Sequence, residues 1–173
     1  ATNCRPALKR STGTRSSRGA GSPGKAAAFL APDINAHISD PFAFPGVREA
    51  ADRLWAAIRG GRDIVVFGDF DADGVSAAAI VSIALRRMGG RAEVFLPARE
   101  TEGYGLGLAA IERCFAERGS PPAVLLTVDC GIGSVEEVEH LKQRGVEVII
   151  SDHHEPGPEL PRADVLVNPR LGA

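Results

Sequence analysis

The chain has 173 residues, of which 44% are hydrophobic and 24% charged, with a formal net charge of −2. These values are typical of a globular protein with one sizeable core. No apolar run approaches the ~20 residues that a spanning helix requires, and the first residues lack the apolar segment of a secretory signal. The three cysteines are odd in number and widely spaced, which suits neither a disulfide framework nor a zinc pair. We therefore expect a cytoplasmic protein that makes no contact with membranes.

Charge is distributed unevenly along the chain. Residues 1–25 contain six basic side chains and no acidic one, and this stretch is rich in Ser, Thr and Gly. Such a composition buries too little apolar surface to offset the entropy of ordering. We predict a basic disordered tail over residues 1–27 and one domain over residues 28–173. The tail suits a solubilising extension, a weak contact with a phosphate backbone, or an organellar transit peptide.

The rest of the chain alternates between helical and strand-like patterns. An amphipathic helix is predicted at 47–59, followed by strands at 64–67, 92–96, 123–128, 146–150 and 164–167, with helices at 75–88, 106–118 and 135–144 between them. Ser134 and Glu137 have the spacing of a capping box at the start of the last helix. Continuous apolar strands separated by helices indicate an α/β fold, a parallel sheet of about five strands with helices on both faces.

Ionisable residues follow four of the predicted strands. The segments are GDFDADG at 68–74, PARETEGYG at 97–105, DCG at 129–131 and DHHE at 152–155. Parallel strands end at one edge of a sheet, where open α/β proteins place their sites. So many acidic groups would repel one another unless a cation lay among them. Carboxylates with imidazoles suit Mn²⁺ or Mg²⁺, and the imidazoles favour Mn²⁺.

Each segment taken alone has a simpler interpretation. The Asp-x-Asp pattern could only cap the next helix, and two adjacent histidines could only mark an exposed strand end. Residues 69–74 match the opening of an EF-hand loop, but Ile80 replaces the bidentate Glu that the loop requires. The G-x-x-x-x-G-K spacing at 19–25 is followed by Ala26 in place of Ser or Thr, and no strand precedes it. Both motif interpretations are rejected, and the coincidence of four strand ends favours a metal site.

Together these motifs resemble the DHH phosphoesterase superfamily. GDFDADG, PARETEGYGL, TVDCGI and SDHHEP occur here in the order and approximate spacing of that family. The second and third are particularly similar to those of its RecJ-like, single-strand-specific exonuclease branch. The resemblance runs from about residue 29 to residue 170 and includes DPFAFPG before the first helix and VNPR near the end.

The resemblance implies a site for two divalent ions, Mn²⁺ or Mg²⁺. The implied metal ligands are Asp69, Asp71, Asp129 and His153. The implied catalytic residues are Asp73, which closes the first loop, Asp152, which orients an imidazole, and His154, which faces the scissile phosphate or the second ion.

The segment after the second predicted strand suits substrate binding. Arg99 and the loop of Gly103, Tyr104 and Gly105 lie at a helix start, where phosphate binds well, and Tyr104 could stack on a base. Arg99 has an alternative role as a structural ion-pair partner of Glu100 or Glu102.

The activity that the resemblance implies is metal-dependent phosphodiester hydrolysis. The expected enzyme is a 5′ to 3′ exonuclease on single-stranded DNA in repair or recombination, with repair or replication proteins as partners. One alternative is hydrolysis of short oligonucleotides, cyclic dinucleotides or pyrophosphate; another is a non-catalytic scaffold in replication. The family pattern continues beyond Ala173 with a further metal-binding Asp and a second domain. We therefore expect an N-terminal portion of the DHH domain, truncated at its C-terminus, with an incomplete site.

Overall fold

The computed structural model describes residues 22–31, 33 and 40–171, and it divides the chain into two units, 1–40 and 41–173. The described part of the first unit contains helix α1 (Pro23–Leu30), whose cap Ser22 accepts a hydrogen bond from the Lys25 amide at 3.3 Å. The predicted tail of residues 1–27 overlaps this helix at residues 23–27, where a serine cap, a proline at the first helical position and a run of alanines all favour a helix. Residues 1–21 of the predicted tail lie outside the described residues.

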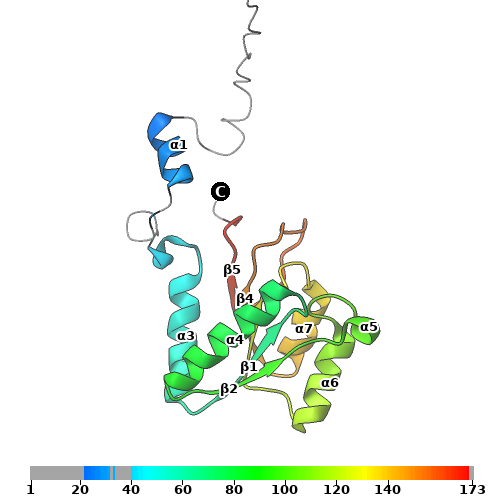
Figure 1. Cartoon of the computed structure of the whole chain (residues 1–173). Helices are drawn as coiled ribbons and strands as arrows, with labels where there is room; N and C mark the ends of the chain where they lie inside the picture. Colours follow the sequence, from blue (N-terminus) through cyan, green and yellow to red (C-terminus); the bar gives the residue numbers. More distant parts are fainter. Residues whose placement is uncertain (1–21, 32, 34–39, 172–173) are drawn as a thin grey trace, which may run out of the picture. The chain divides into compact units, whose positions relative to one another are not determined.

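The second unit is built on one parallel sheet (Figure 1). Its strands, in the order β2-β1-β3-β4-β5, are β1 (Asp63–Gly68), β2 (Arg91–Phe95), β3 (Val124–Val128), β4 (Glu147–Ser151) and β5 (Val165–Val167). Every neighbouring pair is parallel. The register pairs Gly68 with Val128, Val128 with Ser151, and Ser151 with Val167. These strands therefore end level with one another, and the residues that follow them emerge along one edge.

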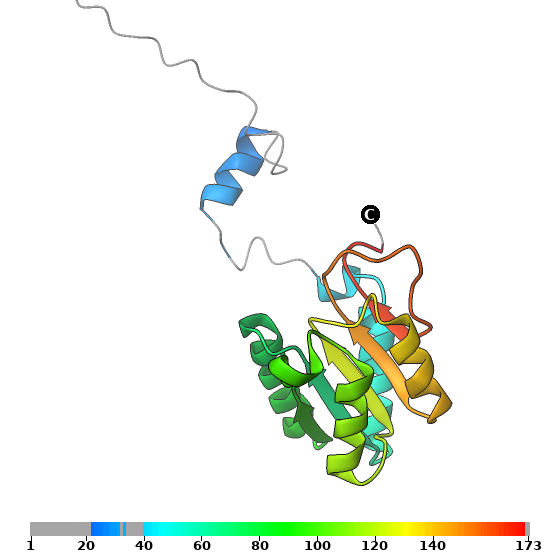
Figure 2. The same ribbon diagram turned by 90° about the vertical axis from the view of Figure 1, so that its right-hand side faces the viewer.

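Helices cover both faces of this sheet, as Figures 1 and 2 show. One face packs against α3 (Val47–Arg59) and α4 (Ala72–Arg87), and the other against α6 (Leu108–Arg118) and α7 (Val135–Gln143). Alternate strand residues supply the two cores: Val65 and Phe67 point to α6, whereas Ile64 and Val66 belong to the core beneath α3 and α4. The predicted α/β fold, with about five parallel strands and helices on both faces, is confirmed. None of the helices in the described ranges is long and apolar enough to cross a membrane.

The structure also contains short elements and boundaries that differ from the prediction. A 3₁₀ helix η1 (Pro41–Ala43) precedes α3, and a short helix α5 (Arg99–Glu102) follows β2. Helix α4 begins at Ala72, earlier than predicted, because Asp71 caps it. Ser134 is the cap residue of α7, but the predicted capping box is wrong, since its side chain makes no capping hydrogen bond. Its hydroxyl instead donates to the carbonyl of Leu106 at 3.2 Å, a tertiary acceptor that the local sequence does not reveal.

Candidate metal centre

Asp129 follows β3 in an unusual backbone conformation. Its φ is +63°, a left-handed conformation that Asp adopts more readily than most residues. Its amide donates to the carbonyl of Ser151 at 2.9 Å, which ties it to the end of β4. The side chain is only 7% exposed. Burial and the nearby charge of Asp71 raise the pKa of the Asp129 carboxyl above its ordinary value. This group therefore gains from any neighbouring positive charge.

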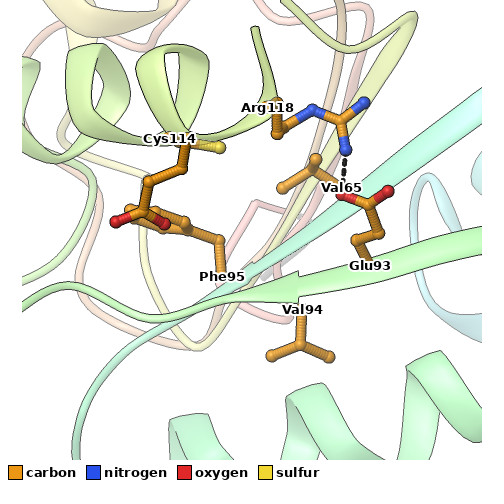
Figure 3. Close-up of a pocket in the computed structure, with 7 residues that line it drawn as sticks. Val65, Glu93, Val94, Phe95, Cys114 and Arg118 are labelled. Carbon is orange, nitrogen blue, oxygen red and sulfur yellow. Dashed lines mark hydrogen bonds and ion pairs between the residues drawn. The ribbon is translucent and has the colours of Figure 1, made fainter.

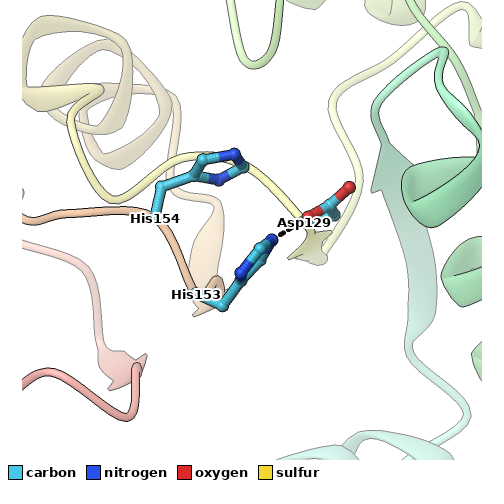
Figure 4. A group of neighbouring side chains, drawn as sticks. All are labelled: Asp129, His153 and His154. Atoms are coloured by element: carbon cyan, nitrogen blue, oxygen red, sulfur yellow. Dashed lines mark ion pairs between the residues drawn. The ribbon is translucent and has the colours of Figure 1, made fainter. Parts of the chain in front are cut away.

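Two histidines lie beside this carboxylate. His153 Nε2 is 2.9 Å from Asp129 Oδ1 (Figure 4). Asp129, His153 and His154 each offer one ligand atom, and these atoms lie within 4.8 Å of one another. Carboxylate oxygen and imidazole nitrogen at this spacing could hold a divalent cation that accepts both donor types.

Asp152 holds the backbone of both histidines and the ring of His154. Its side chain is 1% exposed. Oδ1 accepts from the amides of His153 at 2.7 Å and His154 at 3.1 Å and lies 2.7 Å from His154 Nδ1, while Oδ2 accepts from the Ile132 amide at 2.9 Å. Burial opposes ionisation of Asp152, but these hydrogen bonds outweigh it and lower the pKa. The resulting carboxylate raises the pKa of His154. Asp152 therefore fixes the ring of His154 and turns Nε2 outward.

The aspartates after β1 complete the acidic edge. Asp69 is fully buried, and its Oδ1 accepts from the Phe70 amide at 2.7 Å. Asp69 Oδ2 is also buried but has no hydrogen-bond partner among the residues the structure describes. Asp71 Oδ1 accepts from the amides of Gly74 at 2.9 Å and Asp73 at 3.0 Å, and these bonds, led by that from Gly74, lower the pKa of Asp71. A buried, unpartnered carboxylate oxygen is costly, and a bound cation would satisfy it.

Gly74 allows α4 to begin against Asp69. A Cβ at this position would lie 2.6 Å from both the nitrogen and the carbonyl oxygen of Asp69. Asp73, in the first turn of α4, lines an open groove together with Asp129 and His153. The structure thus brings the predicted acidic residues of β1 and β3 to the same edge as the histidines.

The predicted substrate-binding residues lie beside the histidines. Tyr104 Oη is 3.1 Å from His154 Nε2, and its ring meets the ring of Phe70 edge-on at 5.9 Å. Loss of water and the charge of Asp69 raise the pKa of Tyr104 to about 12, although the residue is 57% exposed overall. The guanidinium of Arg99 faces the Phe70 ring at 5.1 Å. Gly103 and Gly105 both have positive φ, which turns the chain around Tyr104.

The comparisons with known proteins identify the family. Residues 63–172 match the sequence model of a protein family described as "DHH family, N-terminal domain". The chain belongs to the DHH family. Residues 152–154 are hereafter called the DHH triplet.

The chain is similar to RecJ proteins of this family. It is 41% identical over 136 residues to the single-stranded-DNA-specific exonuclease RecJ of Bacillus subtilis, a match that covers 79% of this chain and 17% of that protein. A crystal structure of exonuclease RecJ bound to manganese superposes with a TM-score of 0.67 at 40% identity, covering 74% of this chain and 32% of that one. RecJ of Thermus thermophilus in complex with Mn²⁺ gives a TM-score of 0.67 at 34% identity over 91% of this chain and 20% of that one. The chain therefore spans about a sixth of the length of this curated relative.

Two residues that support the DHH triplet were not predicted. Asn168 Nδ2 donates to the carbonyl of His154 at 2.9 Å, and Arg170 Nε donates to the carbonyl of His153 at 3.1 Å. Both follow β5, so extending the strand-end pattern from the first four strands to the fifth would have found them. Phe70 was also missed as a site residue, because a lone aromatic between two aspartates carries no distinctive pattern.

A separate hollow lies between β2 and α6 (Figure 3). Its lining residues are Val65, Glu93, Val94, Phe95, Cys114, Glu117 and Arg118, and none of them belongs to the edge that carries the DHH triplet. Loss of water raises the pKa of Cys114 to about 11, and burial also raises that of Cys130. Both thiols are buried, and their raised pKa disfavours the thiolate form that a cysteine nucleophile needs.

Proposed function

We propose that this chain carries the metal-binding part of a 5′ to 3′ exonuclease that hydrolyses phosphodiester bonds of single-stranded DNA. The observation that carries the proposal is that the ligand atoms of Asp129, His153 and His154 lie within 4.8 Å of one another, on the same sheet edge as Asp69 with its unpartnered buried oxygen. The likeness to single-stranded-DNA-specific exonucleases supports the substrate class. Manganese in two solved relatives, and Mg²⁺ in a further structure of the Thermus thermophilus protein with a TM-score of 0.50, support a divalent ion.

The proposed metal ligands are Asp69, Asp71, Asp129 and His153. They combine hard carboxylate oxygens with one imidazole, a donor set that suits Mn²⁺ and Mg²⁺ better than a thiolate-dependent zinc site. Two bound ions would supply hydroxide at neutral pH and neutralise charge on the phosphoryl group. Their positive charge would also relieve the cost of ionising buried Asp129.

The remaining site residues would bind and orient the substrate. Asp152 holds the ring of His154 through Nδ1. Nε2 of His154 can then bind a phosphate oxygen once its contact with the hydroxyl of Tyr104 is broken. Because the pKa of His154 is raised, the ring is more readily protonated and can donate a charge-assisted hydrogen bond to that oxygen. Asp73 lines the groove beside Asp129 and would contact the entering water or an ion.

The surface beside the DHH triplet favours a single strand over a duplex. Tyr104 is exposed and offers an aromatic ring for an unpaired base, and Arg99 offers a guanidinium for the adjoining phosphate. Positive φ at Gly103 and Gly105 lets the backbone of this loop approach the phosphate closely. Repair and recombination in the cytoplasm, with repair or replication proteins as partners, form the cellular setting of this proposal.

A nuclease assay tests the proposal. The chain and the complete gene product that contains it are incubated with Mn²⁺ and with single-stranded or duplex DNA labelled at either end. We expect mononucleotides from the 5′ ends of single strands only. Asp129→Ala should abolish this release. Glu136→Ala, which removes an acid on α7, should not.

Two results would overturn the proposal. One is the absence of hydrolysis by the complete gene product. The other is equal cleavage of cyclic dinucleotides or pyrophosphate, which would assign the site to small substrates. Binding of the replication machinery without any hydrolysis would point to a scaffold.

A further inference from the structure

The segment from Ala98 to Gly105, here called the α5 loop, has little structure of its own to hold its shape. Helix α5 is a single turn, and a helix this short is unstable alone. Gly103 and Gly105 follow it with φ of +80° and +71°, and glycine adds flexibility to the unfolded chain. The loop nevertheless presents Tyr104 at 3.1 Å from His154. Some other contact must therefore fix it.

Glu102 makes that contact from inside the loop. Its side chain is only 6% exposed. Oε2 accepts from the amide of Ala98 at 2.7 Å, which closes the single turn of α5 on itself. Oε1 and Oε2 also accept from Nε and Nη2 of Arg113 at 2.6 and 2.9 Å, a two-pronged ion pair. The ion pair with Arg113 lowers the pKa of Glu102 despite its burial.

Arg113, on α6, connects the loop to the rest of the domain. Its Nη2 donates to the carbonyl of Leu96 at 2.9 Å, just past the end of β2. Its guanidinium lies 4.2 Å from the centre of the Phe95 ring. A planar guanidinium can make all of these contacts at once, whereas the ammonium group of lysine cannot. Arg113 therefore ties α5, β2 and α6 together.

We propose that Glu102 and Arg113 are positioning residues that hold Arg99 and Tyr104 in place beside the DHH triplet. The inference rests on the proposed function for the roles of Arg99 and Tyr104. The pair of Glu102 and Arg113, here called the clamp, is itself a feature of the folded chain. It also bears on the alternative role of Arg99 as a structural partner of Glu102, since that carboxylate is occupied by Arg113. Arg99 is thereby left facing Phe70.

The chain offers a matched control for this clamp. Arg113 Nη1 also pairs with Glu117 at 2.8 Å, one turn further along α6, and the Glu117 side chain is 57% exposed. An exposed ion pair at this spacing contributes little to the stability of the fold. Glu117→Gln therefore removes a negative partner of the same arginine without touching the α5 loop. Glu102→Gln removes the negative charge of the buried partner. Arg113→Lys keeps the positive charge but cannot make the two parallel hydrogen bonds of the guanidinium.

The experiment uses Tyr104 as its reporter. Tyr104 is the sole tyrosine of the chain and Trp55, on α3, is the sole tryptophan. Fluorine NMR of protein labelled with fluorotyrosine and fluorotryptophan therefore gives one signal from the loop and one from a distant helix. We expect the Tyr104 signal to shift or broaden in Glu102→Gln and Arg113→Lys and to stay unchanged in Glu117→Gln. The Trp55 signal should be the same in all three variants and so verify the fold.

A binding measurement adds the functional consequence. Affinity for a single-stranded oligothymidylate, measured without divalent ions so that no cleavage occurs, should fall by about tenfold in the first two variants, in line with the loss of a charged hydrogen bond. It should be unchanged in Glu117→Gln. A Tyr104 signal that stays unchanged in folded Glu102→Gln and Arg113→Lys would overturn the clamp, whatever the nuclease assay gives. Shifted Tyr104 signals, together with no hydrolysis by the complete gene product, would instead support the positioning role of Glu102 and Arg113 and refute the proposed function.

Discussion

Replacing Gly74 with alanine should destabilise the domain and disturb the acidic edge of the sheet. An added Cβ would lie 2.6 Å from the nitrogen, 2.6 Å from the oxygen and 2.8 Å from the carbon of Asp69. These are backbone atoms at the end of β1, so they cannot rotate away as a side chain would. Overpacking of this kind costs about 1–3 kcal/mol, and backbone contacts belong at the upper end of that range. The higher helix propensity of alanine would offset up to about 1 kcal/mol of this cost.

The net expectation is a loss of about 2 kcal/mol, which corresponds to a fall in Tm of roughly 4–12 °C for a domain of this size. Urea unfolding followed by circular dichroism measures it. Gly133→Ala is the matched control, because a Cβ there meets nothing within 4 Å, and its effect should stay within about 0.5 kcal/mol. If Gly74→Ala were as stable as the wild type, the close approach of α4 to Asp69 would not be what requires glycine. Mn²⁺ affinity should also fall in Gly74→Ala, since Asp69 must move.

Three further predictions concern partly or fully buried groups whose pKa is shifted by their surroundings. Asp164 pairs with Lys142 at 2.6 Å and accepts from the Val148 amide at 2.8 Å; these contacts outweigh burial and lower its pKa. The stabilisation that Asp164 gives is therefore complete above the pKa of the unfolded state and is lost as pH falls through the folded pKa. Asp164→Asn should lower the free energy of unfolding by about 1–3 kcal/mol at pH 7 and by progressively less in acid. Urea titrations at several pH values measure this difference. Asp152→Asn leaves amide donors facing an NH₂ group and should cost about 2–3 kcal/mol in the same assay; an effect under about 0.5 kcal/mol would contradict the hydrogen bonds assigned to it. Cys114 should resist maleimide at pH 7 until the chain unfolds, and rapid labelling of the native protein, located by peptide mass spectrometry, would contradict its burial.

The fold was predictable because the central strands β1, β3 and β4 are buried on both faces and the helices are separated by clear breaks. Helix α3 begins and ends at the predicted residues, since Gly60 and Gly61 end the apolar stripe sharply. The start of α4 and the capping box of α7 were predicted wrongly, because a capping contact decides the first and a tertiary contact the second. The start of α4 depends on Asp71, which was assigned to the preceding loop as a metal ligand, and the hydroxyl of Ser134 is taken by Leu106 from a distant segment.

The location of the candidate site was predictable from the parallel sheet alone, because strands in level register deliver their following residues to one edge. Its contacts were not. Whether His154 or His153 would meet Asp152 depends on the turn after β4, and the structure gives that bond to His154 while His153 turns to Asp129. The pairing of Glu102 with Arg113 joins segments whose distance in space follows from the packing of α6 on the sheet. No local pattern encodes it.

Calorimetric titration of the chain with Mn²⁺ tests the central claim, that the acidic edge beside the DHH triplet is a metal site. Asp129→Asn is the decisive variant, because asparagine keeps the shape and tolerates the positive φ of this position but removes the charge. Glu136→Gln on α7 is the control for a general loss of negative charge. We predict that the wild type and Glu136→Gln bind Mn²⁺ alike and that Asp129→Asn binds at least about tenfold more weakly. Equal Mn²⁺ affinity in all three proteins, or no binding to the wild type, would contradict the claim.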